Sequence, residues 1–390
     1  MVVAANRGLA RAKEICQDRP ARAKELRAQG KKIMGYLCLY PVIEMMTAVD
    51  VVPYRMFGEI KTPRTTADNF LPPVVCPYLR SLLEMGLTGK YDFFDGVSYA
   101  HICDGGGHFQ NAWIVTVKPT YFHILGTPHT LHESALQHHK ILLQDYQKFL
   151  EDFTGQKLTT EKLKKAVNAH NQQRALVREL YELKKSDPPK LSGVETMQIM
   201  MAIMSLPVDE GTQLLQEAIS EIKQRKLTLT KKPARLMMWG SIMDYTELVE
   251  MIESLDANVV MDDTCVGSRA FFDDVKMTDD PLDGLTYHYL ADLKCPRTYK
   301  EAVVTDGHKD YKADIENRFS YIQDFAKDWK VNGVILEAMR YCDAHAYDVP
   351  QLKDYLDSIG LPNIYLELDY TEASLAPLRT RVQGLVELIG

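Results

Sequence analysis

The spacing of apolar residues along the chain predicts an alternation of strands and helices. Four short apolar runs predict buried strands, at residues 31–40, 51–58, 93–100 and 121–125. One helix is expected to have Pro41 in its first turn, a second should run from Cys76 through Met85, and residues 102–108 should form a loop. Because strands that alternate with helices form parallel sheets, residues 30–130 are expected to make an α/β domain.

The rest of the chain divides into helical segments and a second alternating region. Residues 1–30 are charged and favour helix, and residues 132–226 place apolar side chains at three- and four-residue spacing, with a break at 186–193. Strands then resume in the C-terminal third, at residues 235–241, 258–263, 333–339 and 363–368. The two alternating regions resemble each other in the order of their elements.

This pattern predicts the α/β class, with two parallel-sheet domains and a helical middle segment. The boundaries expected from it are an N-terminal α/β domain with its leading helix at 1–150, a helical connection at 151–230, and a C-terminal α/β domain at 231–390. A chain of 390 residues with 46% hydrophobic residues is long enough for two cores of ordinary size.

Composition excludes several functional classes. No apolar run approaches the roughly 18 residues of a membrane helix, and charges appear too early for a signal peptide, so a cytoplasmic protein without membrane contact is expected. The net charge is -7 and the basic clusters are short, so the sequence does not indicate a nucleic-acid-binding surface. Seven scattered cysteines indicate reduced thiols or metal ligands more than a disulfide framework.

Three cysteines are candidate metal ligands: Cys76, Cys103 and Cys342. Each lies where a predicted strand ends or a helix begins, and such positions converge on ligands in α/β sheets. Three thiolates would leave one position of a tetrahedral or cubane site open, as catalytic metal sites require. The alternative is three unrelated buried thiols, which the long separations alone favour, because free cysteine is commonly buried.

Two further loops hold candidate polar groups. Asp262 and Asp263 end a predicted strand, and Ser268 and Arg269 follow after Gly267, which suits either an anion site or a helix cap with a salt bridge. The glycine run at 105–107 lacks the GxGxxG spacing, so a dinucleotide site is not expected.

Several stretches resemble one known family. They include CPYLRSLLEMGL at 76–87, HICD at 101–104, MDDTCVGSR at 261–269, RYCD at 340–343 and the C-terminal ELDYT and LRTR segments. In this order they resemble the cluster-bearing subunits of 2-hydroxyacyl-CoA dehydratases and ATP-dependent benzoyl-CoA reductases. The resemblance spans nearly the whole chain.

The resemblance implies a fold, a cofactor and partners. It implies two Rossmann-like domains with a [4Fe-4S] cluster in the cleft between them, held by Cys76, Cys103 and Cys342. It also implies a related second cluster-bearing subunit, an ATP-hydrolysing iron-sulfur activator that delivers one electron at low potential, and a CoA-thioester substrate. The expected reaction is dehydration of a 2-hydroxyacyl-CoA or reduction of an aromatic ring conjugated with the thioester.

The resemblance also suggests roles for single residues. Glu44 matches an acidic position that could hold a ligand water or bind the open iron, and His101 could donate a hydrogen bond or a proton near the cluster. Arg55, Ser268 and Arg269 are candidates for binding anionic parts of the substrate or CoA. For Glu44 and His101, a surface carboxylate and a backbone-bonded histidine are the simpler interpretations.

The chain departs from the family pattern at a few positions. Asp50 replaces a glycine in a turn, and Gly105 to Gly107 replace the start of a longer, more regular helix. The remaining cysteines are interpreted as structural, with Cys16 on a helix face, Cys38 in a strand core, and Cys265 and Cys295 in family-like loops without a ligand role.

Three functions remain open. The first is an iron-sulfur subunit of the radical CoA-thioester enzymes. The second is a reductase of small unsaturated molecules that carries a double-cubane cluster, which requires additional cysteines packed near the first three. The third is a cluster-free structural subunit that has kept the fold.

Overall fold

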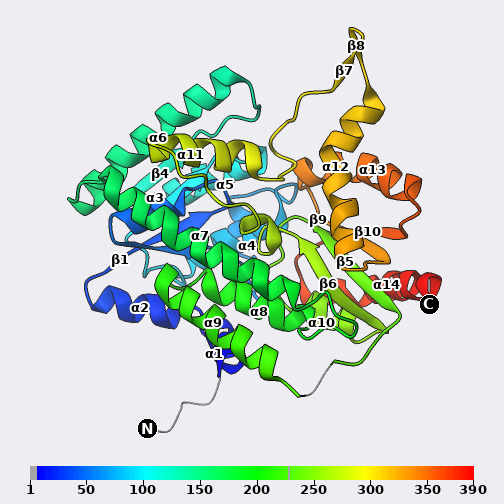
Figure 1. Ribbon diagram of the computed structural model, residues 1–390. Coiled ribbons are helices and arrows are strands. Elements are labelled where there is room, and N and C mark those ends of the chain that lie inside the picture. The colour runs from blue at the N-terminus through cyan, green and yellow to red at the C-terminus, as the bar shows by residue number, and fades with distance from the viewer. Residues whose placement is uncertain (1–6, 227–228) are drawn as a thin grey trace.

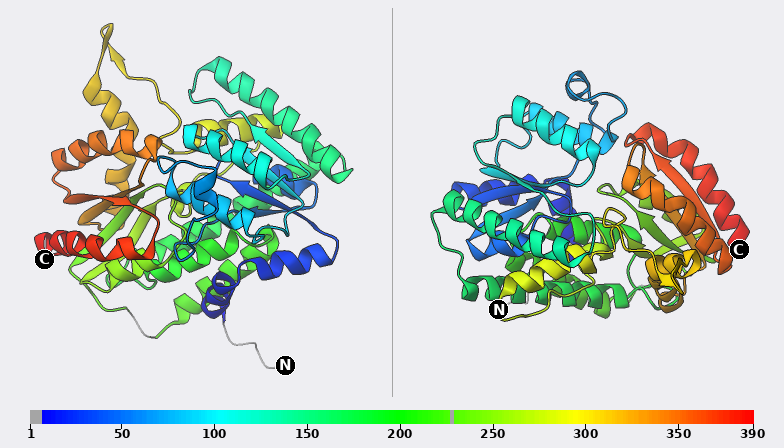
Figure 2. Two further views of the ribbon diagram at one scale, coloured as in Figure 1. Left: turned by 180° about the vertical axis from the view of Figure 1, so that it is seen from behind. Right: turned by 90° about the horizontal axis from the view of Figure 1, so that it is seen from above.

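The computed structural model describes residues 7–226 and 229–390 and contains two four-stranded parallel sheets flanked by helices (Figure 1). This arrangement confirms the predicted fold class. Seen from above, the two sheets lie side by side, and the green middle helices run beneath both (Figure 2, right). The described residues include no helix with the length and apolar character needed to cross a lipid bilayer.

The N-terminal sheet has the order β2-β1-β3-β4, and every neighbouring pair is parallel. Its strands coincide with the four predicted apolar runs: β1 Lys32–Leu37, β2 Val51–Arg55, β3 Gly96–Ala100 and β4 Phe122–Leu125. The helices that connect them are α3 Ile43–Ala48, the 3-10 turn η1 Ala67–Asn69, α4 Pro77–Leu87 and α5 Asp104–Thr116.

Helix α5 contradicts the loop predicted at 102–108. The glycines Gly105 to Gly107 form its first turn despite their low helix propensity. Burial of Phe109 and Trp113 against the sheet and a side-chain cap from Cys103 provide the compensating stabilisation. Tertiary packing therefore overrides local propensity here.

The C-terminal sheet has the order β10-β9-β5-β6, again all parallel. Its strands are β5 Ala234–Gly240, β6 Ala257–Asp263, β9 Gly333–Met339 and β10 Asn363–Leu368. Its helices are α10 Glu247–Glu253, the 3-10 turn η2 Ser268–Ala270, α12 Tyr311–Asp328, α13 Asp343–Ser358, η4 Glu372–Ser374 and α14 Leu375–Ile389.

The two sheets share one topology. In each, the first strand in the chain lies between the second and the third, and the fourth pairs with the third. The strand order therefore reverses between β1 and β3 in one sheet and between β5 and β9 in the other. Ligands of open α/β sheets bind beyond the carboxyl ends of strands at such a reversal.

The middle of the chain is helical, as predicted. Its helices pack on both sheets, with α6 (Glu133–Thr154) against β4, α7 (Thr160–Glu182) against α3, and α8 (Gly193–Ile203) against β6 and α10. The expected domain limits at 150 and 230 thus remain predictions. The helices of this region and of the N-terminus are α1 Gly8–Gln17, α2 Pro20–Ala28, α6 Glu133–Thr154, α7 Thr160–Glu182, α8 Gly193–Ile203 and α9 Val208–Gln224.

One segment of the C-terminal half has structure that periodicity did not predict. Helix α11 Pro281–Tyr287 continues into a π-helical turn, His288–Asp292. A short hairpin follows, with β7 Val304–Thr305 paired to β8 His308–Lys309, and it projects from the body of the molecule (Figure 1). The loop at 293–303 between these features reaches back toward the carboxyl ends of both sheets and contributes to the site below.

Candidate functional site

A cavity of about 90 Å³ lies beyond the carboxyl ends of the strands of both sheets, next to both strand-order reversals. Its wall includes residues that follow β1, β3, β5, β6 and β9, and the first turn of α4. Six of the seven cysteines line it: Cys38, Cys76, Cys103, Cys265, Cys295 and Cys342. The sequence reasoning expected three of these in one place.

The three predicted ligands share a local structure. Cys76, Cys103 and Cys342 are the N-cap residues of α4, α5 and α13. The Cys103 Sγ accepts a hydrogen bond from the Gly106 N–H at 3.3 Å. The partial positive charge at a helix N-terminus favours a thiolate, so each of these sulfurs faces a fixed dipole that suits an anionic ligand.

Burial opposes ionisation of these thiols in the protein alone. It raises the pKa of Cys76 to about 12, against hydrogen bonds from the Leu79 and Tyr78 backbone that lower it. Burial also raises the pKa of Cys103 and of Cys342. Because a coordinating metal deprotonates thiols outright, metal binding here would release protons and would tighten as pH rises.

The other three cysteines, Cys38, Cys265 and Cys295, line the same cavity and lie close enough to act electrostatically on one another. Burial and the neighbouring Cys295 raise the pKa of Cys38 to about 11, and burial raises that of Cys265 to about 12, with Cys295 and Cys38 adding to the shift. Cys38 is not in a strand core: β1 ends at Leu37, and Cys38 turns out of the sheet with φ 73°. Such strained backbone is common at functional sites.

Two buried arginines give the cavity a positive wall. Arg55 and Arg297 are 1% and 6% exposed, and neither forms an ion pair within the described ranges. Arg55 donates to the Cys38 carbonyl, and Arg297 donates to the His101 and Thr127 carbonyls. Buried charges are normally paired, so these two guanidinium groups favour an anionic occupant.

The chemistry of the donor set fits an iron-sulfur cluster. Six cysteine side chains line one cavity, and thiolates are the usual ligands of such clusters. Among residues 7–226 and 229–390, no three His, Cys, Asp or Glu side chains form a group that could hold a metal ion. Soft thiolates select iron-sulfur clusters, copper(I) or zinc, and a positively charged, hydrogen-bonded shell stabilises an anionic cluster.

Glu44 lies outside this cavity. Its side chain is completely buried in α3, where Oε1 is 2.5 Å from Nη2 of Arg174 and Oε2 accepts a hydrogen bond from Tyr289 at 2.7 Å. It is therefore not the surface carboxylate considered above. Its predicted role at an iron remains a prediction, and this ion pair offers it no support.

The ring of His101 is exposed and lies against that of His129, with 5.8 Å between their centroids. Its carbonyl accepts from Nε of Arg297 at 3.0 Å. Its side chain does not line the cysteine cavity. A proton-donor role for His101 thus also stays a prediction.

Arg55 alone of the three predicted substrate-binding residues lines the cysteine cavity. The Ser268 hydroxyl donates to the Asp262 carbonyl at 2.6 Å, and Arg269 pairs with Asp263 at 2.9 Å while lying 3.0 Å from the His345 ring nitrogen. These contacts correspond to the second interpretation of this loop, a helix cap with a salt bridge. Arg269 still touches Cys265, with 3.8 Å between Nη1 and Sγ.

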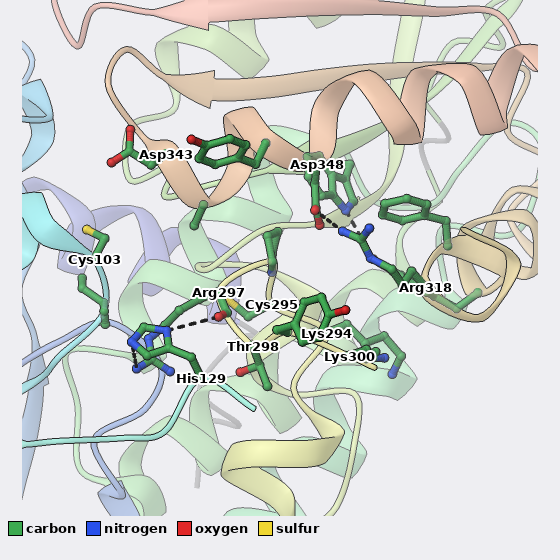
Figure 3. Close-up of a pocket in the computed structure, with 18 of the residues that line it drawn as sticks. Cys103, His129, Lys294, Cys295, Arg297, Thr298, Lys300, Arg318, Asp343 and Asp348 are labelled. Atoms are coloured by element: carbon green, nitrogen blue, oxygen red, sulfur yellow. Dashed lines mark hydrogen bonds and ion pairs between the residues drawn. The ribbon is translucent and has the colours of Figure 1, made fainter. Parts of the chain in front are cut away.

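A larger cavity of about 600 Å³ adjoins the first and shares Cys103, Cys295 and Arg297 with it. Its wall carries three basic side chains, Lys294, Lys300 and Arg318, on the side away from Cys103 (Figure 3). The sequence analysis did not predict these residues. The available signal was the run of basic residues around Cys295, in LKCPRTYK.

Comparison with known proteins identifies the family. A family model for 2-hydroxyglutaryl-CoA dehydratase, D-component, matches residues 38–389. The (R)-phenyllactyl-CoA dehydratase beta subunit of Clostridium sporogenes is 25% identical over 94% of this chain and 94% of its own length. A benzoyl-CoA reductase subunit of Thauera aromatica is 24% identical, over 92% and 91%. The beta subunit of (R)-2-hydroxyglutaryl-CoA dehydratase from Acidaminococcus fermentans is 22% identical, over 93% of both.

These relatives are enzyme subunits, and they cover nearly the whole chain. The segment of this chain that the family model matches contains the six cysteines of the cavity. The resemblance expected from the sequence motifs is therefore confirmed, and the chain belongs to the 2-hydroxyglutaryl-CoA dehydratase D-component family.

Proposed function

We propose that this chain is the iron-sulfur subunit of an ATP-activated enzyme that reduces CoA thioesters by one electron. In this proposal a [4Fe-4S] cluster is held by Cys76, Cys103 and Cys342, and the reaction is 2-hydroxyacyl-CoA dehydration or aryl-CoA ring reduction. The observation that carries it is the meeting of these three N-cap cysteines, which lie far apart in the sequence, at one cavity.

The chain's own residues give the site its electrostatics. Positive potential around the sulfurs comes from the N-termini of α4, α5 and α13 and from Arg55 and Arg297, which form no ion pair with any described residue. This potential favours thiolates and an anionic cluster. The apolar wall, which includes Leu79, Ile102 and Met339, excludes water. A bound cluster would supply single electrons and, at an iron without a protein ligand, a Lewis acid.

The proposal includes two protein partners and a compartment. A related second subunit is supported by the relatives, each of which is named as one subunit of a larger enzyme. A separate ATP-hydrolysing activator would deliver the electron, because a thioester is reduced only at very low potential. The cytoplasm is proposed because thiolate ligands need a reducing compartment.

A second candidate is a reductase of small unsaturated molecules that carries a double-cubane cluster. It requires further cysteines near the first three, and Cys38, Cys265 and Cys295 line the same cavity. Each set of three cysteines could then serve one cubane. This candidate would assign a ligand role to thiols that sequence reasoning treated as structural.

Iron analysis separates the candidates. The chain purified under strict anaerobiosis should contain about four irons and four sulfides for a single cubane and about eight irons for a double one. Cys103→Ser should lose iron in either case while keeping α5, since serine is a good N-cap. Cys265→Ser should lose iron only if the second set of cysteines binds it.

Cys16→Ser is the matched control. Cys16 lies on α1 outside the cavity, where its thiol donates to the Gln198 carbonyl, so iron content should not change. A chain that binds no iron after anaerobic reconstitution would refute both candidates and leave the cluster-free alternative. With partner and activator present, formation of enoyl-CoA or cyclic dienoyl-CoA identifies the reaction, and turnover of small unsaturated molecules alone supports the second candidate.

A further inference from the structure

We propose that the cavity of about 600 Å³ is the substrate site, and that Lys294, Lys300 and Arg318 bind an anionic group of the substrate, a phosphate or a carboxylate. The cavity would then hold the far end of a molecule whose reacting end points toward the cysteines. The assignment as substrate site rests on the function proposed above, whereas the anion-binding property can be measured independently of it.

The position of the cavity suits this role. It shares Ile102, Cys103, Cys295 and Arg297 with the cysteine cavity, so a molecule in one can reach the wall of the other. Its volume lies within the roughly 300–1,000 Å³ usual for small-molecule sites. Aromatic side chains that can cover an organic body line it, among them Trp239, Phe319, Tyr321 and Tyr347.

At the basic end, Lys300 is the one of the three basic side chains without an ion-pair partner among the described residues, although the carboxylates of Asp273 and Asp292 also act on it. Lys294 pairs with Asp273 at 2.8 Å, and Arg318 pairs with Asp348. Lys300 forms no ion pair or hydrogen bond with any described residue, although its side chain is half-buried. Burial, and then repulsion by Lys294 and Arg318, lower the pKa of Lys300. A bound anion would relieve this repulsion and raise that pKa again.

The charged groups at the cysteine end of the cavity indicate how a ligand would be oriented. Asp343 lies near Cys103, on the far side of the cavity from Lys294 and Lys300 (Figure 3). Asp104 lines the same cavity, and neither aspartate has an ion-pair partner in the part of the chain that is described. With the proposed anionic cluster bound, the charges of Arg55 and Arg297 would be balanced, and the cluster together with Asp104 and Asp343 would repel a second negative group at this end. The anionic group of a ligand should therefore lie at the lysines and its uncharged end at the cysteines.

Two kinds of molecule could supply the anionic group. CoA offers a pyrophosphate and a ribose phosphate, and an organic acid offers a carboxylate. Both would form charge-assisted hydrogen bonds with Lys300 and with donors of Arg318 that Asp348 and Gln351 leave free. Three probes distinguish these sources: CoA, inorganic pyrophosphate and glutarate.

The experiment is calorimetric titration of each probe into the anaerobically prepared holoprotein, with iron measured on the same samples. Lys300→Ala should weaken binding of the effective probe at least tenfold, and Lys300→Arg should restore most of it. Lys148→Ala is the matched control, because Lys148 is a 74% exposed lysine on α6, away from this cavity, and its loss should change nothing.

Each outcome is decisive. Binding of CoA and pyrophosphate without glutarate supports the site with phosphate as its ligand, and binding of glutarate without pyrophosphate supports it with carboxylate. No binding of any probe, or equal binding in Lys300→Ala, would overturn the inference even if the iron content is normal. Probe binding that depends on Lys300 in a chain without iron would refute the proposed function and leave the anion site intact.

Discussion

Glu44 and Arg174 form a completely buried ion pair between α3 and α7. Burial alone would raise the pKa of Glu44, but the charges of Arg174, His170 and His288 and the Tyr289 hydrogen bond outweigh it and lower that pKa to about 2. Removing one partner of such a pair leaves a buried charge uncompensated. The position therefore has a structural explanation that needs no contact with a cofactor.

The resulting prediction separates the structural role from a role at iron. Glu44→Gln should destabilise the protein by about 3–5 kcal/mol, and Glu44→Gln combined with Arg174→Met should recover part of that loss. Urea unfolding measures both. Normal stability of Glu44→Gln together with lost activity would instead favour the catalytic assignment.

The pKa of Glu337, on β9, is shifted in the opposite direction to that of Glu44. Burial raises its pKa from 4.5 to about 8, against a hydrogen bond from Ser241 and the charge of Arg269. Between these pH values the folded protein keeps a proton that the unfolded chain has released. The free energy of unfolding should therefore fall as pH rises from about 4.5 to 8, and this contribution should be level above pH 8.

Glu337→Gln tests this linkage because glutamine cannot ionise. The variant should lose that part of the pH dependence and exceed the wild type in stability by about 2–5 kcal/mol near pH 8, with a smaller difference near pH 5. Urea unfolding at both pH values is the measurement. Parallel pH profiles for the two proteins would mean that Glu337 ionises normally.

At the scale of elements, the alternation of apolar runs and helical segments was sufficient to predict all eight strands of the two sheets. It was sufficient because strands buried on both faces are nearly continuous apolar runs, as in β5 and β9. The strand order within each sheet depends on which edges pair across the whole fold, and periodicity carries no such information. For this reason Cys38 and Cys265 were not expected beside Cys103.

The same limit explains why the basic residues of the cavity of about 600 Å³ were not predicted from the sequence. Its basic residues come from the loop at 293–303 and from α12, and nothing local indicates that the two meet. Of the three N-cap cysteines, only Cys76 was predicted at a helix start, which Pro77 marks in the sequence. Cys103 and Cys342 were expected in loops, and the resemblance to a known family grouped the three as ligands.

The turn between α3 and β2 offers a test at this scale. Asp50 has φ 62°, in the left-handed region that glycine adopts without a steric penalty. Its salt bridge to Lys31 is exposed and contributes little. Asp50→Gly should therefore raise stability by about 0.5–1 kcal/mol, and Asp50→Ala should lower it, as measured by thermal unfolding. A more stable alanine variant would show that the turn is not strained.

At the scale of the whole molecule, the cysteine cavity exists only while the two sheets are held together. On one side Arg297, from the C-terminal half, donates to the Thr127 and Pro128 carbonyls of the N-terminal half. On another side Asp244, which follows β5, accepts from the Gly58 N–H at 2.8 Å and from the Tyr370 hydroxyl at 2.7 Å. These contacts hold the walls that carry the cysteines in position.

Asp244 is buried, and burial raises its pKa to about 6, so a neutral group of the same shape should serve nearly as well. Asp244→Asn keeps an acceptor for the Gly58 N–H and a partner for Tyr370. Asp244→Ala leaves both donors without a partner, which costs about 1–3 kcal/mol for each buried group and weakens the contact between the halves.

If a cluster bridges the two halves as proposed, weakening this contact should expose it. Asp244→Ala should release iron to a chelator about tenfold faster than the wild type under anaerobic conditions, and Asp244→Asn should release it at nearly the wild-type rate. The absorbance of the iron-chelator complex follows the rate directly. Equal rates in all three proteins would show that Asp244 does not control access to the cavity, and attention would then move to the Arg297 side of the interface.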